Sequence, residues 1–101
     1  MSLARSESRM IRGRILKILE IDYPHFVSDR VINLTLNDVK LSAPPAVIGG
    51  HLQYLMEKGY VEVSPVVSSE LGLSMNMARL TAKGKDLLEG SIEPDVGVYL
   101  E

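Results

Sequence analysis

The sequence predicts one mainly α-helical domain that carries a small β-hairpin. Two observations support this fold class. The segment 42–60 has the start and stop signals of a helix and runs directly into a strand, and two earlier segments repeat apolar residues at helical spacing. With 101 residues, 46% of them apolar, the chain suits one small domain. We therefore treat 1–101 as a single domain, with its core over 4–90 and a C-terminal tail over 91–101.

The first helix is expected over 7–22, because apolar residues recur there every three or four positions. That stripe consists of Ile11, Ile15, Ile18 and Leu19. A second, shorter helix is expected over about 28–38, with Ser28 as its N-cap and Asp29 in its first turn. The short second helix, a tight turn and a third helix together predict a helix-turn-helix.

The third helix organises the rest of the chain. Ser42 is the expected N-cap, and Pro44 and Pro45 fall in the first turn, where a missing N–H is tolerated. Gly59 is expected to end the helix in a left-handed conformation. Its predicted core stripe is Ile48, Leu52 and Leu55.

A hairpin and a last helix follow. The segment 60–63 alternates like a strand, and 77–80 is the expected return strand. The segment 64–76 between them is expected to be a long loop, and it contains no Lys or Arg. Thr81 is the predicted N-cap of a helix over 82–89, which Gly90 ends.

Composition excludes several classes of function. There is no cysteine, which rules out a disulfide scaffold, thiolate catalysis and a zinc finger. The two histidines have no second ligand at metal-binding spacing, and no phosphate loop or catalytic triad pattern is present. We therefore expect no enzyme activity, no metal and no cofactor. No apolar run approaches the roughly 20 residues of a membrane span, so a cytoplasmic protein is expected.

Two segments carry a family resemblance. The run from His51 to Val61, HLQYLMEKGYV, is similar to the end of the recognition helix and the first wing strand of ArsR-type and MarR-type regulators. The run LTAKGKDLL, from Leu80 to Leu88, is similar to the step from wing to helix in the same groups. The run from Leu88 to Val98 also resembles the tails of short ArsR-like proteins of Mu-type prophages. The chain thus resembles a winged helix-turn-helix protein with a three-helix bundle, a wing and a C-terminal helix.

The resemblance implies a transcriptional regulator that binds double-stranded DNA, as a homodimer, with its third helix in the major groove. Gln53 and His51 are the candidate base contacts. The candidate phosphate contacts are Arg5, Arg9, Arg12, Arg14, Lys58, Arg79, Lys83 and Lys85. Five of the eleven basic residues lie between Arg5 and Lys17, and their face is interpreted either as a phosphate-contacting patch or as an ordinary solvated surface.

The outward face of the third helix departs from the pattern of such regulators. It offers mostly Ala, Pro, Val and Gly, whereas bases are read by side chains that donate or accept hydrogen bonds. The net charge is −2, and the predicted wing loop has no basic residue. These observations keep a second hypothesis open, in which the chain is a winged-helix module for protein–protein interaction without sequence-specific DNA reading.

Overall fold

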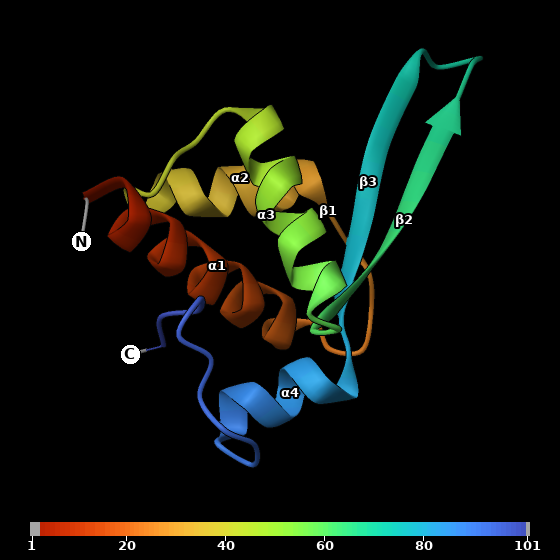
Figure 1. Cartoon of the computed structure of the whole chain (residues 1–101). Helices are drawn as coiled ribbons and strands as arrows, with labels where there is room; N and C mark the ends of the chain where they lie inside the picture. The colour runs from red at the N-terminus through yellow and green to blue at the C-terminus, as the bar shows by residue number, and fades with distance from the viewer. Residues whose placement is uncertain (1–2, 101) are drawn as a thin grey trace.

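The computed structural model of the chain describes residues 3–100. Its helices are α1 (Leu3–Ile21), α2 (Asp29–Asp38), α3 (Pro45–Glu57) and α4 (Ala82–Glu89). Its strands are β1 (Val27–Ser28), β2 (Val61–Ser68) and β3 (Leu73–Leu80). Figure 1 shows the helices gathered in one body, from which β2 and β3 project as a long hairpin.

Short-range chemistry accounts for most helix ends. The Ser28 hydroxyl accepts a hydrogen bond from the Val31 N–H, and the Thr81 hydroxyl accepts one from the Gly84 N–H. Gly59 and Gly90 adopt positive φ angles of 83° and 77° where α3 and α4 end. The prediction of Ser42 as an N-cap was wrong. Pro44 occupies that position, because its extended conformation places Pro45 at the first helical residue.

The sheet is larger than expected. Its three strands are antiparallel in the order β1-β3-β2, and the edge strand β1 pairs Val27 with Ala78. The register of β2 and β3 runs without a break from Val61 opposite Leu80 to Ser68 opposite Leu73. The segment 64–76 is therefore mostly hairpin rather than the predicted loop, and only residues 69–72 form its turn.

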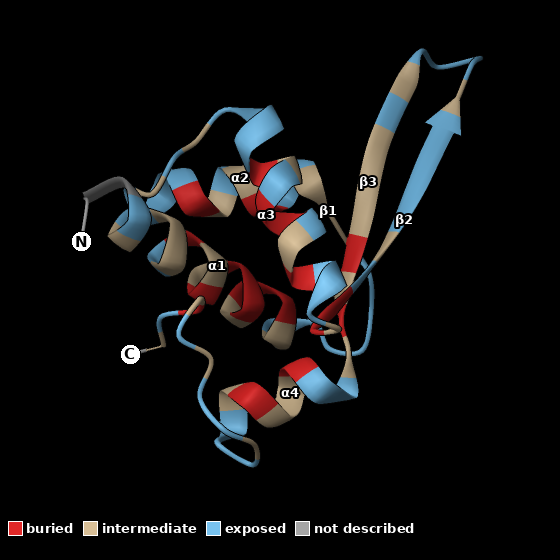
Figure 2. Ribbon diagram, in the orientation of Figure 1, coloured by how far each residue is buried: buried red, intermediate tan, exposed pale blue. Residues whose placement is uncertain are grey.

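One aliphatic core joins the helices to the base of the hairpin. The red bands in Figure 2 lie on the facing sides of α1, α3 and α4 and at the inner ends of β2 and β3. Ile15, Leu36 and Leu55 are fully buried, as the helical stripes predicted. Val98 belongs to the same core, so the predicted tail packs back onto the body.

The tail reaches α1 through a contact that requires a glycine. The Tyr99 N–H donates to the Arg9 carbonyl at 3.0 Å. A Cβ at Gly13 would overlap the Tyr99 carbonyl oxygen, so this position tolerates no side chain without movement of the tail. No helix within residues 3–100 is long and apolar enough to span a bilayer.

Candidate nucleic-acid interface

The outward face of α3 is open to solvent. Pro45, Ala46, Val47 and Gly50 are exposed on it, and Gln53 follows one turn later. The Gln53 Nε2 donates a 3.0 Å hydrogen bond to the Glu57 Oε2, which leaves its carbonyl oxygen as an acceptor that this bond does not use. The predicted base-reading face therefore exists as a surface, but it carries one amide beside a carboxylate.

His51 lies on the opposite side of the same helix. Its side chain is buried, and its Nδ1 accepts a 3.2 Å hydrogen bond from the Arg12 Nε. Burial and the nearby Arg12 charge both lower the pKa of His51, so the ring is neutral at neutral pH. The structure thus places the two predicted base contacts on different faces, with only Gln53 at the surface.

The arginines of α1 contact the tail. Arg12 donates from Nη1 to the Gly97 carbonyl at 3.2 Å and lies 3.8 Å from the centre of the Tyr54 ring. Arg9 approaches the Val96 carbonyl at 3.5 Å. Much of the predicted basic face therefore holds the C-terminal segment against the body.

Four of the predicted phosphate contacts do lie together. Arg5, Arg9, Arg12 and Lys58 line one shallow hollow, together with Tyr54 and Asp95. Arg14 is separate from this group and lines a small cavity of about 10 Å³ with Lys17 and Leu41. The structure thus divides the predicted basic patch of α1 into two parts.

The remaining predicted cations are engaged in local contacts. Arg79 forms a two-pronged pair with Glu62 at 3.0 and 2.7 Å, and Lys85 pairs with Glu20 at 3.0 Å. The Lys83 Nζ donates to the Lys58 carbonyl at 3.0 Å. Hydrogen bonding to Glu20 raises the pKa of Lys85, so that pair stays charged at neutral pH. Such exposed pairs contribute little stability, and a phosphate can replace the carboxylate.

Asp95 makes three polar contacts at this site, and the sequence did not predict it as a site residue. Its carboxylate accepts from the Tyr60 hydroxyl at 2.7 Å and the Gly97 N–H at 2.8 Å, and it pairs with Lys58 at 3.1 Å. The Asp-Val-Gly turn was the available signal, because an Asp side chain commonly binds the backbone two residues on. Within residues 5–100, no cluster of His, Asp or Glu has the arrangement of a metal site.

Solved structures share this architecture. A PadR-like transcription factor of Bacteroides fragilis aligns over 87% of this chain and 84% of its own, with a TM-score of 0.69 and 20% identity. A protein of Thermoplasma acidophilum assigned as a transcriptional regulator, TA0346, aligns over 75% and 69%, with a TM-score of 0.62 and 21% identity. The chain has a winged-helix fold.

A third winged-helix neighbour was solved with DNA. Bacillus subtilis PadR, in complex with operator DNA, aligns over 90% of this chain with a TM-score of 0.63 and 20% identity. The chain spans about half of that protein, 54% of its length. No protein-family model and no curated protein matches the sequence. Two of these neighbours are PadR or PadR-like proteins, whereas the sequence motifs resemble ArsR and MarR types, so the ArsR/MarR assignment stays a prediction.

In the winged-helix frame, α2 and α3 form the helix-turn-helix and the β2–β3 hairpin is the wing. From Val63 to Ala78 the wing contains no Lys or Arg and one acid, Glu70. Val66, Val67 and Leu71 are exposed in its outer half. The first cation after this stretch is Arg79, in β3 at the base of the wing, and it is already paired with Glu62.

Proposed function

We propose that this chain is a transcriptional regulator that binds double-stranded DNA with the exposed face of α3. The observation that carries the proposal is the open face itself, which runs from Pro45 to Gln53 and is covered by nothing within residues 3–100. In a helix-turn-helix protein, this face is the one that enters the major groove. The fold shared with a PadR protein that was solved on operator DNA supports the same conclusion.

The proposed DNA contacts are fewer than those predicted from the sequence. Gln53 is the proposed base contact, while His51 is not retained because it is buried against Arg12. Arg5, Lys58 and Lys83 are exposed and Arg79 pairs with the exposed Glu62, so these four are the proposed phosphate contacts. We assign Arg12 to holding the tail.

We further propose that the regulator acts as a homodimer. A single reading face with one amide side chain gives little discrimination between sequences, and two copies double the contacts. Light scattering coupled to gel filtration tests this directly, because a mass of one chain at the concentration that binds DNA contradicts it.

The experiment for DNA binding is a fluorescence anisotropy titration. A labelled duplex of mixed sequence is titrated with the chain at low salt, where phosphate contacts are strongest. We expect binding that weakens as the salt concentration increases. On a duplex sequence selected for tight binding, we expect Gln53→Ala to bind more weakly than wild type. No binding to any duplex at low salt ends the proposal.

A second function has its own supporting observation. The uncharged wing with exposed Val66, Val67 and Leu71 is poorly suited to phosphate and well suited to apolar contact. In the protein-interaction alternative, the wing docks on another protein and DNA is not read. The two functions differ in the expected result of the titration above: the alternative predicts no sequence-dependent DNA binding, and it predicts that substituting these three residues by Ser weakens binding to a protein partner.

A further inference from the structure

Arg30 is a cation that neither the sequence analysis nor the proposed contacts include. It lies in the first turn of α2 and is exposed. Within residues 5–100 its guanidinium makes no hydrogen bond, ion pair or ring contact, in contrast to Arg12, Arg79 and Lys85. An unpaired guanidinium keeps its full charge and all its donors for a ligand.

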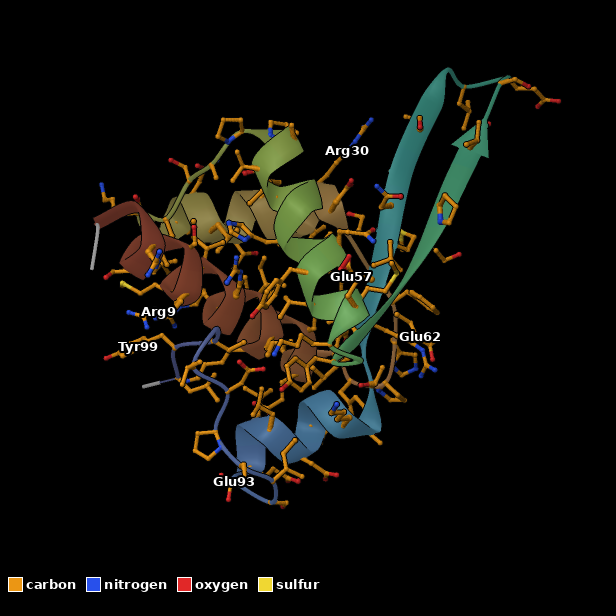
Figure 3. All side chains as sticks on the ribbon, viewed as in Figure 1. Arg9, Arg30, Glu57, Glu62, Glu93 and Tyr99 are labelled. Carbon is orange, nitrogen blue, oxygen red and sulfur yellow. The ribbon has the colours of Figure 1, made fainter. Side chains whose placement is uncertain are left out.

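Arg30 lies at a cleft formed by three elements. The cleft has a volume of about 270 Å³ and is lined by Asp29, Arg30 and Asn33 of α2, Pro45 and Ile48 of α3, and Ser74 of β3. Figure 3 shows Arg30 extending outward from α2 beside the first turn of α3 and toward the wing. It is thus the basic residue at the junction of the helix-turn-helix and the wing.

The other polar groups of the cleft, Asp29 among them, form no ion pair or hydrogen bond with Arg30 within residues 5–100. The Asp29 carboxylate is directed to the Asn76 N–H, from which it accepts a 3.2 Å hydrogen bond. The Asn33 Oδ1 is buried without a hydrogen-bond partner within residues 5–100, so its amide retains unused capacity. Ser74 adds an exposed hydroxyl. The cleft therefore holds one unpaired cation, one carboxylate that is hydrogen-bonded to the backbone, and two neutral side chains that can hydrogen-bond to water.

The position of the cleft selects the ligand. A duplex that lies on the exposed face of α3 has a sugar–phosphate backbone at each edge of its major groove, which is about 12 Å wide. The first helix of a helix-turn-helix crosses such a backbone. Because the cleft adjoins Pro45 at the start of that face, a phosphate of this backbone comes within reach of Arg30.

We propose that Arg30 binds a backbone phosphate of duplex DNA at this cleft, and thereby fixes the register of α3 in the groove. The inference rests on the proposed DNA-binding function. A phosphate contact of this kind positions the protein but carries no sequence information. Its loss should therefore weaken binding to all duplexes alike.

The test compares two charge-removing variants. Arg30→Gln removes the proposed contact, and Lys17→Gln removes one cation from α1 that also lacks a partner within residues 5–100. Affinity is measured by anisotropy over a series of salt concentrations. We expect Arg30→Gln to bind about 10-fold more weakly at low salt and to reduce the slope of log K against log salt by about 0.9, uniformly across sequences.

The controls make each outcome decisive. Arg30→Lys should recover the slope but only part of the affinity, because lysine keeps the charge and loses the fork of donors. Thermal melts of all variants show whether the fold is retained. Wild-type affinity in a folded Arg30→Gln, or an equal loss in Lys17→Gln, overturns the inference while leaving the proposed function intact. If the wild-type chain binds no duplex, both fall together.

Discussion

At the scale of single residues, Asp95 connects parts of the chain that are far apart in sequence. Its side chain is 7% exposed, and its partners come from the end of α3, the start of β2 and the tail. A buried carboxylate is tolerated only when charge and hydrogen bonds compensate for lost water. Burial alone raises the pKa of Asp95, but bonds from Tyr60, the Gly97 N–H and Lys58 bring it below its ordinary value.

The first prediction is that Asp95→Asn destabilises the fold by about 2 kcal/mol at neutral pH. The amide has no charge, so the ion pair with Lys58 is lost and the hydrogen bonds from Tyr60 and Gly97 become weaker. A carboxylate whose pKa is lowered in the folded state stabilises that state above its unfolded pKa, and the contribution is lost as pH falls through the folded pKa. The difference between variant and wild type in urea unfolding should therefore shrink below about pH 3.8. Glu62→Gln, which removes an exposed carboxylate, is the matched control and should change little.

The second prediction concerns Tyr60. Burial, and then the hydrogen bond and negative charge of Asp95, raise its pKa to about 12. The folded state favours the neutral phenol. The stability that Tyr60 contributes to the fold is therefore fully present below the ordinary pKa of 10.0 and is lost as pH rises through about 12. Tyrosinate absorbance during alkaline titration should show one late-ionising group that is absent in Tyr60→Phe. Identical curves for the two proteins would refute the assignment.

At the scale of elements, glycines serve opposite purposes in α3 and in the tail. An added Cβ at Gly49 or Gly50 would meet no other atom within 4 Å, so packing does not require these glycines. At Gly97 the same atom would overlap the Tyr54 hydroxyl, as it would overlap the Tyr99 carbonyl at Gly13. Close approach of the tail depends on Gly97 and on Gly13 of α1, whereas α3 keeps two glycines that weaken it.

The third prediction follows for α3. Gly50→Ala should stabilise the fold by about 1 kcal/mol, since glycine is the poorer residue in a helix interior. The added methyl group stands on the exposed face, where the proposed duplex lies, so DNA affinity should fall while the melting temperature rises. Unchanged affinity in this variant would mean that DNA does not approach α3 closely at residue 50.

The fourth prediction concerns the tail. Gly13→Ala should destabilise the fold by about 1–3 kcal/mol, because the methyl group forces the Tyr99 backbone away from α1. Limited proteolysis should then cut the C-terminal segment sooner than in wild type. Alanine at Gly49, equally a helix position but with open space, is the control and should not expose the tail.

Local chemistry in the sequence predicted the elements better than their extents. Helix ends could be predicted from the sequence, because each depends on its immediate neighbours. Examples are the N-caps Ser28 and Thr81 and the helix-ending glycines Gly59 and Gly90. The outer wing was not predicted, because Ser64 to Val67 of β2 are all exposed and include a proline, although Leu73, Met75 and Met77 alternate with polar residues in β3. For the site, the sequence predicted only which residue types could contact DNA. It could not predict that Arg12 pairs with His51 or that Arg30 stays unpaired, because both depend on tertiary contacts.

At the scale of the molecule, the wing is a projection without a core. The molecule measures 44 × 29 × 23 Å, and burial along the hairpin falls from Val61 and Leu80 at its base to exposed residues at its end. Our fifth prediction is that amide hydrogen exchange is slow at the base and fast in the outer half, because local opening there exposes almost no buried apolar surface. Uniform protection along both strands would contradict it.

The return of the tail to α1 also determines where further chain can be attached. The backbone of Tyr99 is bonded to Arg9 in the first half of α1, so both described ends lie on one side of the body, remote from the wing (Figure 1). A fluorescent reporter, an affinity tag or another domain fused at either end would leave from that side. The open face of α3 would stay uncovered, so immobilising the protein by either terminus should preserve its capacity to capture a duplex.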